Sequence, residues 1–257
     1  MGLVDTVLEL CISHKLQTPR LAYDTGRKMW LPKFSLFGHL LAEKVKTQPE
    51  LILSAEVSWK YFSRVAHIFI AECKDPEIAH ARASGWKLEN YKPVARQLAS
   101  IVSEDINLAY DVGAKFPDER FEPIKDIIYE RVLSDLRLSL FALSGWNSER
   151  SSEFSSYAVQ KWGEVIVDRV EGFTKREKII WSDISNEMDV KVLEGLPISE
   201  TKIVIEAYGF ALQNRAEDYF FKNFKTVIQD GNVKPWAEHI INHFEEPAIG
   251  GDTYRIA

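Results

Sequence analysis

Residues 49–73, PELILSAEVSWKYFSRVAHIFIAEC, decide the fold that we expect for this chain. Pro49 suits the first position of a helix, where its missing N–H costs nothing. The strongly polar residues between Leu51 and Ile70 recur every three or four positions, which places them in one narrow stripe of a helix surface. Because a helix that is apolar nearly all round is buried, the sequence predicts one long central helix over 49–73. The residues of the stripe are Glu56, Lys60, Arg64 and His67.

This polar stripe has two interpretations. Charges at this spacing commonly face water, and Glu56 and Lys60 would then form an ion pair four positions apart. Alternatively, the stripe lines a polar cavity inside the protein. The sequence leaves both open.

Helical periodicity also dominates on either side of the central segment. No alternation typical of strands and no repeat of fixed period is evident. The prediction is an all-α protein, a single multi-helix bundle of about nine or ten helices around residues 49–73. We expect one domain over 1–246, with a possible sub-boundary near 172–198, and a flexible tail over 247–257. The expected helices cover residues 3–15, 34–47, 49–73, 92–115, 120–144, 147–170, 174–181, 200–228 and 235–246.

Composition limits the class of protein. Of the 257 residues, 46 % are hydrophobic and 27 % are charged, which excludes a disordered chain. The net charge of −6 argues against a protein that coats nucleic acid. The N-terminus has no basic segment typical of a signal peptide, and no apolar run approaches the ~18 residues of a membrane span. We therefore expect a soluble, cytoplasmic protein without membrane association.

One pair of residues suggests metal chemistry. Glu77 and His80 have the E-x-x-H spacing of a ferritin-like centre, where a carboxylate and an imidazole on one helix face hold iron or manganese. Such a centre needs a second E-x-x-H, and the sequence has none. The alternative is a helix start, with Asp75 as the N-cap, Pro76 in the first position and Glu77 favouring the helix dipole.

Basic and aromatic residues gather between residues 15 and 33. This stretch contains two prolines and one glycine, so we expect an irregular loop. Cations interleaved with aromatic rings could bind RNA or single-stranded nucleic acid by stacking. The alternative is a solvated basic loop. The candidate binding residues are Arg20, Tyr23, Arg27, Lys28 and Trp30.

The absence of other motifs favours a non-catalytic protein. The sequence has no nucleophile elbow and no phosphate-binding loop, so we assign no catalytic residue and no cofactor. Residues 186–257 hold twelve acidic residues against seven Lys and Arg. We therefore expect a helical interaction or assembly protein that binds a protein partner or self-associates, its basic 15–33 loop meeting this acidic region in an oligomer. The alternatives are a ferritin-like metal-dependent oxidase or oxygenase, and a nucleic-acid binder.

Overall fold

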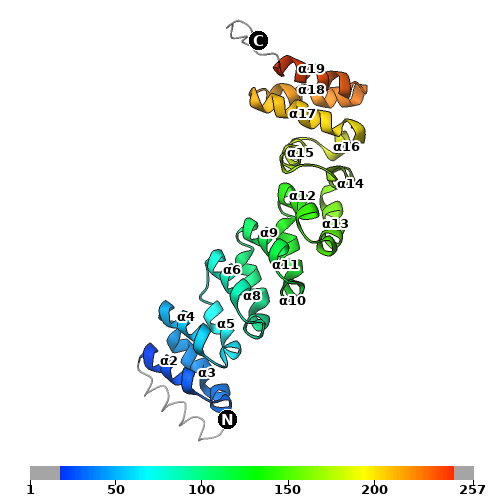
Figure 1. Cartoon of the computed structure of the whole chain (residues 1–257). Coiled ribbons are helices and arrows are strands. Elements are labelled where there is room, and N and C mark those ends of the chain that lie inside the picture. Colours follow the sequence, from blue (N-terminus) through cyan, green and yellow to red (C-terminus); the bar gives the residue numbers. More distant parts are fainter. Residues whose placement is uncertain (1–17, 246–257) are drawn as a thin grey trace. The chain divides into compact units, whose positions relative to one another are not determined.

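The computed structural model describes residues 18–245, coloured along the chain in Figure 1. Every regular element among these residues is a helix, so the all-α prediction is confirmed. The contacts divide the chain into two compact units, Met1–Arg131 (unit 1) and Val132–Ala257 (unit 2). The single domain over 1–246 and the sub-boundary near 172–198 stay predictions. The expected helix over 3–15 and the tail over 247–257 lie outside the described residues.

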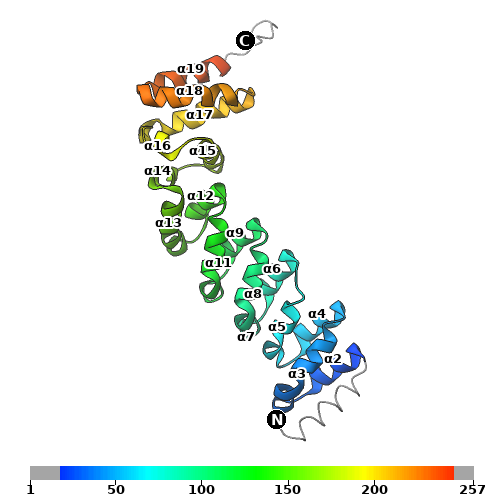
Figure 2. The same ribbon diagram turned by 180° about the vertical axis from the view of Figure 1, so that it is seen from behind.

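Unit 1 is a succession of helical hairpins, in which a ten-residue first helix is followed by a second helical segment. Figures 1 and 2 show these hairpins side by side within the unit. Its α-helices are α2 (Pro19–Lys28), α3 (Leu31–Val45), α4 (Pro49–Ser58), α5 (Ala66–Ile70), α6 (Pro76–Gly85), α7 (Leu88–Tyr91), α8 (Ala95–Val102), α9 (Ile106–Lys115), α10 (Asp118–Phe121) and α11 (Lys125–Val132). Its 3-10 helices are η1 (Phe62–Arg64), η2 (Lys92–Val94) and η3 (Glu122–Ile124).

Unit 2 is built around α17 (Thr201–Gln213), which packs against α15, α18 and α19. Trp181 lies in the core of this unit, fully buried, and its indole N–H donates to the Ile166 carbonyl at 3.1 Å. The remaining helices are α12 (Leu136–Gly145), α13 (Ser148–Trp162), α14 (Glu164–Val167), η4 (Asp168–Val170), α15 (Lys175–Glu187), α16 (Val190–Leu193), η5 (Ile198–Glu200), α18 (Glu217–Asp230) and α19 (Val233–Glu245).

The prediction of one central helix over 49–73 is wrong, because this segment folds as α4, η1 and α5. The hydroxyls of Ser54 and Ser58 donate to backbone carbonyls four residues earlier, at 2.9 and 2.6 Å, and such bonds weaken and bend a helix. Trp59 then takes an extended backbone conformation. Its buried indole N–H donates to the Tyr23 carbonyl at 3.1 Å. The aromatic anchor therefore ends the helix where the apolar pattern suggested continuity.

Four other helices expected from the sequence are also divided, so the helices in the described part of the chain exceed nine or ten. They are the helices over 92–115, 120–144, 147–170 and 200–228. The predicted helix over 92–115 divides at Asp105, whose side chain accepts from the backbone N–H groups of the new helix. Asp135 interrupts 120–144 in the same manner. Apolar periodicity continues through these turns because both helices of a hairpin contribute to one core.

The expectation that the chain has no repeat of fixed period is also wrong. Asp75, Asp105 and Asp135 follow one another at 30-residue intervals, and each caps a ten-residue helix. Each helix ends at an aromatic residue with an extended backbone, and two of these residues, Phe116 and Trp146, are buried. This recurrence is typical of helical-repeat proteins. Buried residues recur at the same offset: Tyr91 and Phe121, Val94 and Ile124, Leu98 and Ile128, Val102 and Val132.

The hairpin that begins at Gln48 is shorter than its neighbours. Gln48 precedes α4 and Asp75 precedes α6, so this repeat has 27 residues instead of 30. Its second helix, α5, has five residues, whereas α8 and α11 have eight each. At 1.5 Å per residue the helix is shorter by about 4.5 Å.

No helix among residues 18–245 is both long enough and apolar enough to cross a membrane.

Candidate binding groove

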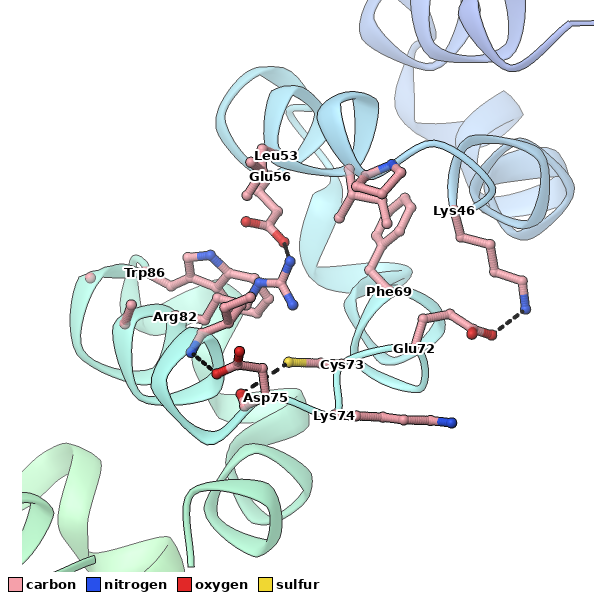
Figure 3. Close-up of a pocket in the computed structure, with 15 residues that line it drawn as sticks. Lys46, Leu53, Glu56, Phe69, Glu72, Cys73, Lys74, Asp75, Arg82 and Trp86 are labelled. Carbon is pink, nitrogen blue, oxygen red and sulfur yellow. Dashed lines mark hydrogen bonds and ion pairs between the residues drawn. The ribbon is translucent and has the colours of Figure 1, made fainter. Parts of the chain in front are cut away.

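A groove of about 680 Å³ lies between α4 and α6, in unit 1 (Figure 3). Its walls are mainly apolar and include Ile52 and Leu53 of α4 and Ile78 of α6, while Phe69 of α5 contributes to the lining below them. Leu53 and Ile78 are exposed, whereas Phe69 is buried. The volume and the apolar walls are typical of sites that bind a ligand.

The groove marks a gap in the packing of first helices. α2 packs against α4, and α6 packs against α9. By contrast, α4 and α6 make at most a marginal contact. The gap coincides with the shortened repeat, whose segment after α5 contributes Glu72 and Cys73 to the lining. Leu53 and Ile78 are therefore exposed on the two sides of this gap.

A buried ion pair spans the groove between its two walls. Arg82 Nη2 of α6 lies 2.8 Å from Glu56 Oε1 of α4, and the side chains are only 11 % and 7 % exposed. In Figure 3 the two side chains point toward one another across the groove, beside Trp86. Burial raises the pKa of the Glu56 carboxyl above its usual value, and the nearby Arg82 and Trp86 side chains partly oppose this rise. Arg82 Nε is buried and, among the described residues, has no hydrogen-bond partner.

The structure separates the four residues of the polar stripe. Glu56 lines the groove, while Lys60, Arg64 and His67 are exposed. The first interpretation paired Glu56 with Lys60, but the partner of Glu56 is Arg82. This partner comes from the next repeat and could not be identified from helical spacing.

The charges around the groove balance one another. Three cations and three anions line it, so it offers no excess of either sign. A phosphate backbone needs an excess of cations, which this groove does not provide. The cations are Lys46, Lys74 and Arg82, and the anions are Glu56, Glu72 and Asp75.

The proposed metal pair lies at the edge of this region. Asp75 Oδ1 accepts from the backbone N–H of Glu77 at 2.9 Å and of Ile78 at 3.2 Å, so the helix-start interpretation is confirmed. The Glu77 side chain is exposed. The His80 ring lies 5.8 Å from the Phe116 ring, and its Nε2 is buried with no hydrogen-bond partner in the described chain. Within residues 18–245 no three His, Cys, Asp or Glu side chains gather as a metal site would require.

The basic stretch over 15–33 is not the irregular loop that we expected. Thr18 caps α2, which covers ten of its residues, and α3 begins directly afterwards. Tyr23 is buried and its hydroxyl bonds the Ser58 hydroxyl at 3.0 Å, so its ring is not available for stacking. The guanidinium of Arg20 lies 5.2 Å from the Tyr23 ring centroid, and Arg20 also pairs with Asp24. The other candidates, Arg27, Lys28 and Trp30, are exposed.

A scan against protein-family models and searches of curated proteins and of solved structures give no match to this chain.

Proposed function

We propose that this chain is a non-catalytic helical-repeat scaffold, and that its α4–α6 groove binds an amphipathic helix of a partner protein. The observation that carries the proposal is the gap between two first helices, with exposed Leu53 and Ile78 on opposite walls. An amphipathic helix that lies in an apolar groove is a common mode of recognition between proteins.

The dimensions of the groove favour a helix as its occupant. α4 and α6 have ten residues each, which gives walls about 15 Å long. A partner helix of about three turns matches this length and presents apolar residues at positions i, i+3 or i+4, and i+7. The partner helix would contact both α4 and α6, which make little contact with each other, whereas α2 and α4 pack directly.

The charge of the groove favours a partner segment with little net charge. Apolar side chains of the partner would cover Leu53 and Ile78. The three cations and three anions of the lining would pair with polar side chains of either sign at the edges of the partner helix.

Selection from a library of displayed helical peptides tests the proposal with the full-length chain. Leu53→Asp introduces a charge into the groove, and Leu36→Asp is the matched control. Both leucines belong to unit 1 and are about equally exposed, at 56 % and 54 %, but Leu36 does not line the groove. The selected peptides should share an apolar residue at every third or fourth position. Leu53→Asp should weaken their binding at least about tenfold, and Leu36→Asp should leave it unchanged.

Four outcomes contradict the proposal. Selected peptides without helical periodicity would exclude a helix as the occupant. Equal binding by wild type and Leu53→Asp would place the interaction elsewhere. If a parallel screen finds only small apolar molecules as ligands, and Leu53→Asp abolishes their binding, the groove is a small-molecule site. Self-association through the groove would appear as a dimer in light scattering that Leu53→Asp converts to monomer, and it would replace the partner by a second copy of the chain.

A further inference from the structure

Unit 2 contains a buried cation that takes no part in the proposed function. Lys178 of α15 is only 6 % exposed. Its ammonium donates to the Ser144 hydroxyl and forms no ion pair with any carboxylate of the described chain. Burial alone lowers the pKa of this amine, and no anion opposes the shift. Buried lysines without a paired charge are rare, because removing an ammonium from water is costly.

Lys178 and the Ser144 hydroxyl that accepts from its ammonium belong to the lining of a wide groove of about 1400 Å³. One wall of this groove is the serine-rich face of α13, and the end of α12 and the segment before α15 complete it. Three serines line the groove together with Lys178: Ser144, which accepts from the ammonium, and Ser148 and Ser151 of α13. Hydroxyl groups of this kind both donate and accept hydrogen bonds.

The polar groups at this end of the groove have unused capacity. An ammonium has three donors, and the Ser144 hydroxyl takes one of them. The Ser151 hydroxyl donates to the Leu143 carbonyl, so its oxygen can still accept a hydrogen bond. Ser148 is the first residue of α13, directly after the N-cap Asn147. The positive end of the dipole of this 15-residue helix therefore lies beside the serines.

We propose that this end of the groove binds the phosphate of a monoester, with Lys178 as the charged contact and the Ser144 and Ser148 hydroxyls as hydrogen-bonding partners. A phosphate oxygen would supply the counter-charge that the buried ammonium lacks. The same oxygens accept from serine hydroxyls and from the N-terminus of a helix.

Two acidic residues of the groove restrict the ligand to an isolated phosphate group. Asp168 and Glu171 line the groove and are exposed. Their charges repel a continuous phosphate backbone, which needs several cations along its length. A single monoester has two sources, a phosphorylated serine residue or a nucleotide, and both present the same group to Lys178.

The test measures binding to the full-length chain by ³¹P NMR titration at constant ionic strength. The probes are inorganic phosphate, O-phosphoserine and adenosine 5′-monophosphate, with chloride as the ionic background. The test variant is Lys178→Gln. Lys175→Gln is the matched control, because Lys175 lies on the same helix, is exposed and does not line this groove. Ser148→Ala leaves the ammonium in place and serves as a second test.

We expect at least one probe to bind saturably to wild type and to Lys175→Gln, at least about tenfold more weakly to Lys178→Gln, and more weakly to Ser148→Ala. Tighter binding of O-phosphoserine points to a phosphorylated peptide, and tighter binding of the mononucleotide points to a nucleotide. Equal binding by wild type and Lys178→Gln overturns the proposal, as does no saturable binding of any probe. If Lys178→Gln does not fold, unchanged affinity in Ser148→Ala overturns it equally.

Discussion

Replacing Arg82 by methionine leaves the Glu56 carboxylate buried without its cation. Because the Glu56 side chain is only 7 % exposed, water does not replace the lost partner. Removing one member of a buried ion pair costs about 3–5 kcal/mol. The pair lines a groove that is open on one side, so we expect the lower end, about 3 kcal/mol of the free energy of unfolding, for Arg82→Met at neutral pH.

The pH dependence of this loss follows from the raised pKa of Glu56. Burial raises this pKa above its usual value of 4.5, and Arg82 lowers it, so the pKa rises further in Arg82→Met. A carboxyl whose pKa is raised by folding adds stability in its protonated form, and this contribution is lost as the pH rises through the folded pKa. The deficit of Arg82→Met should therefore be largest near pH 7 and shrink as the pH falls towards 4.5.

Urea unfolding followed by circular dichroism measures this effect, with hydrogen exchange of residues 49–86 to assign the loss to this part of unit 1. Glu56→Gln combined with Arg82→Met removes both charges and should recover most of the lost free energy. The control is Arg96→Met, which breaks the Arg96–Asp126 pair, whose side chains are 62 % and 61 % exposed. Exposed pairs of this kind contribute about 0–1 kcal/mol. If Arg82→Met loses no more free energy of unfolding than the control, or if its loss does not depend on pH, the Glu56 carboxylate is not a buried charge that needs Arg82.

Three further predictions concern the repeats of unit 1. Asp105→Ala removes a side chain that accepts from two backbone N–H groups, and it should lower the free energy of unfolding by about 1 kcal/mol in a urea titration. Gly26→Ala places a Cβ 2.5 Å from the Trp59 ring and should cost about 1–3 kcal/mol, whereas Gly85→Ala meets no atom within 4 Å and should be neutral or stabilising by up to about 1 kcal/mol in the same assay. Burial raises the pKa of Tyr91 to about 12, so an ultraviolet titration should show a late-ionising tyrosine that Tyr91→Phe removes. The stability that the neutral form of Tyr91 provides should disappear as the pH rises from about 10 to about 12. A titration curve that Tyr91→Phe leaves unchanged above pH 10 would contradict this.

Residues typical of helix starts predicted one helix boundary correctly, but continuous apolar patterns led us to miss two others. The helix start at Asp75 was predicted because an aspartate, a proline and a glutamate follow one another there. Asp105 and Asp135 have the same role but stand within apolar patterns that continue across the turn. Their common 30-residue spacing was the signal that could have revealed the repeat.

The candidate groove could not be predicted from the sequence in the same way. Glu56 and Arg82 belong to different repeats, and their pairing depends on how α4 and α6 are placed. The groove also results from a contact that is nearly absent, and no pattern of residue types encodes a missing contact. The sequence feature that accompanies the groove is the repeat length of 27 residues between Gln48 and Asp75, in place of 30.

The proposed partner helix occupies the space between α4 and α6. The most direct measurement is hydrogen exchange of the full-length chain with and without a saturating amount of the tightest selected helical peptide. Bound peptide should slow exchange in residues 49–58 and 76–85 and leave exchange in α9 and α17 unchanged. Unchanged exchange in those two segments, together with protection elsewhere in the chain, would contradict this proposal.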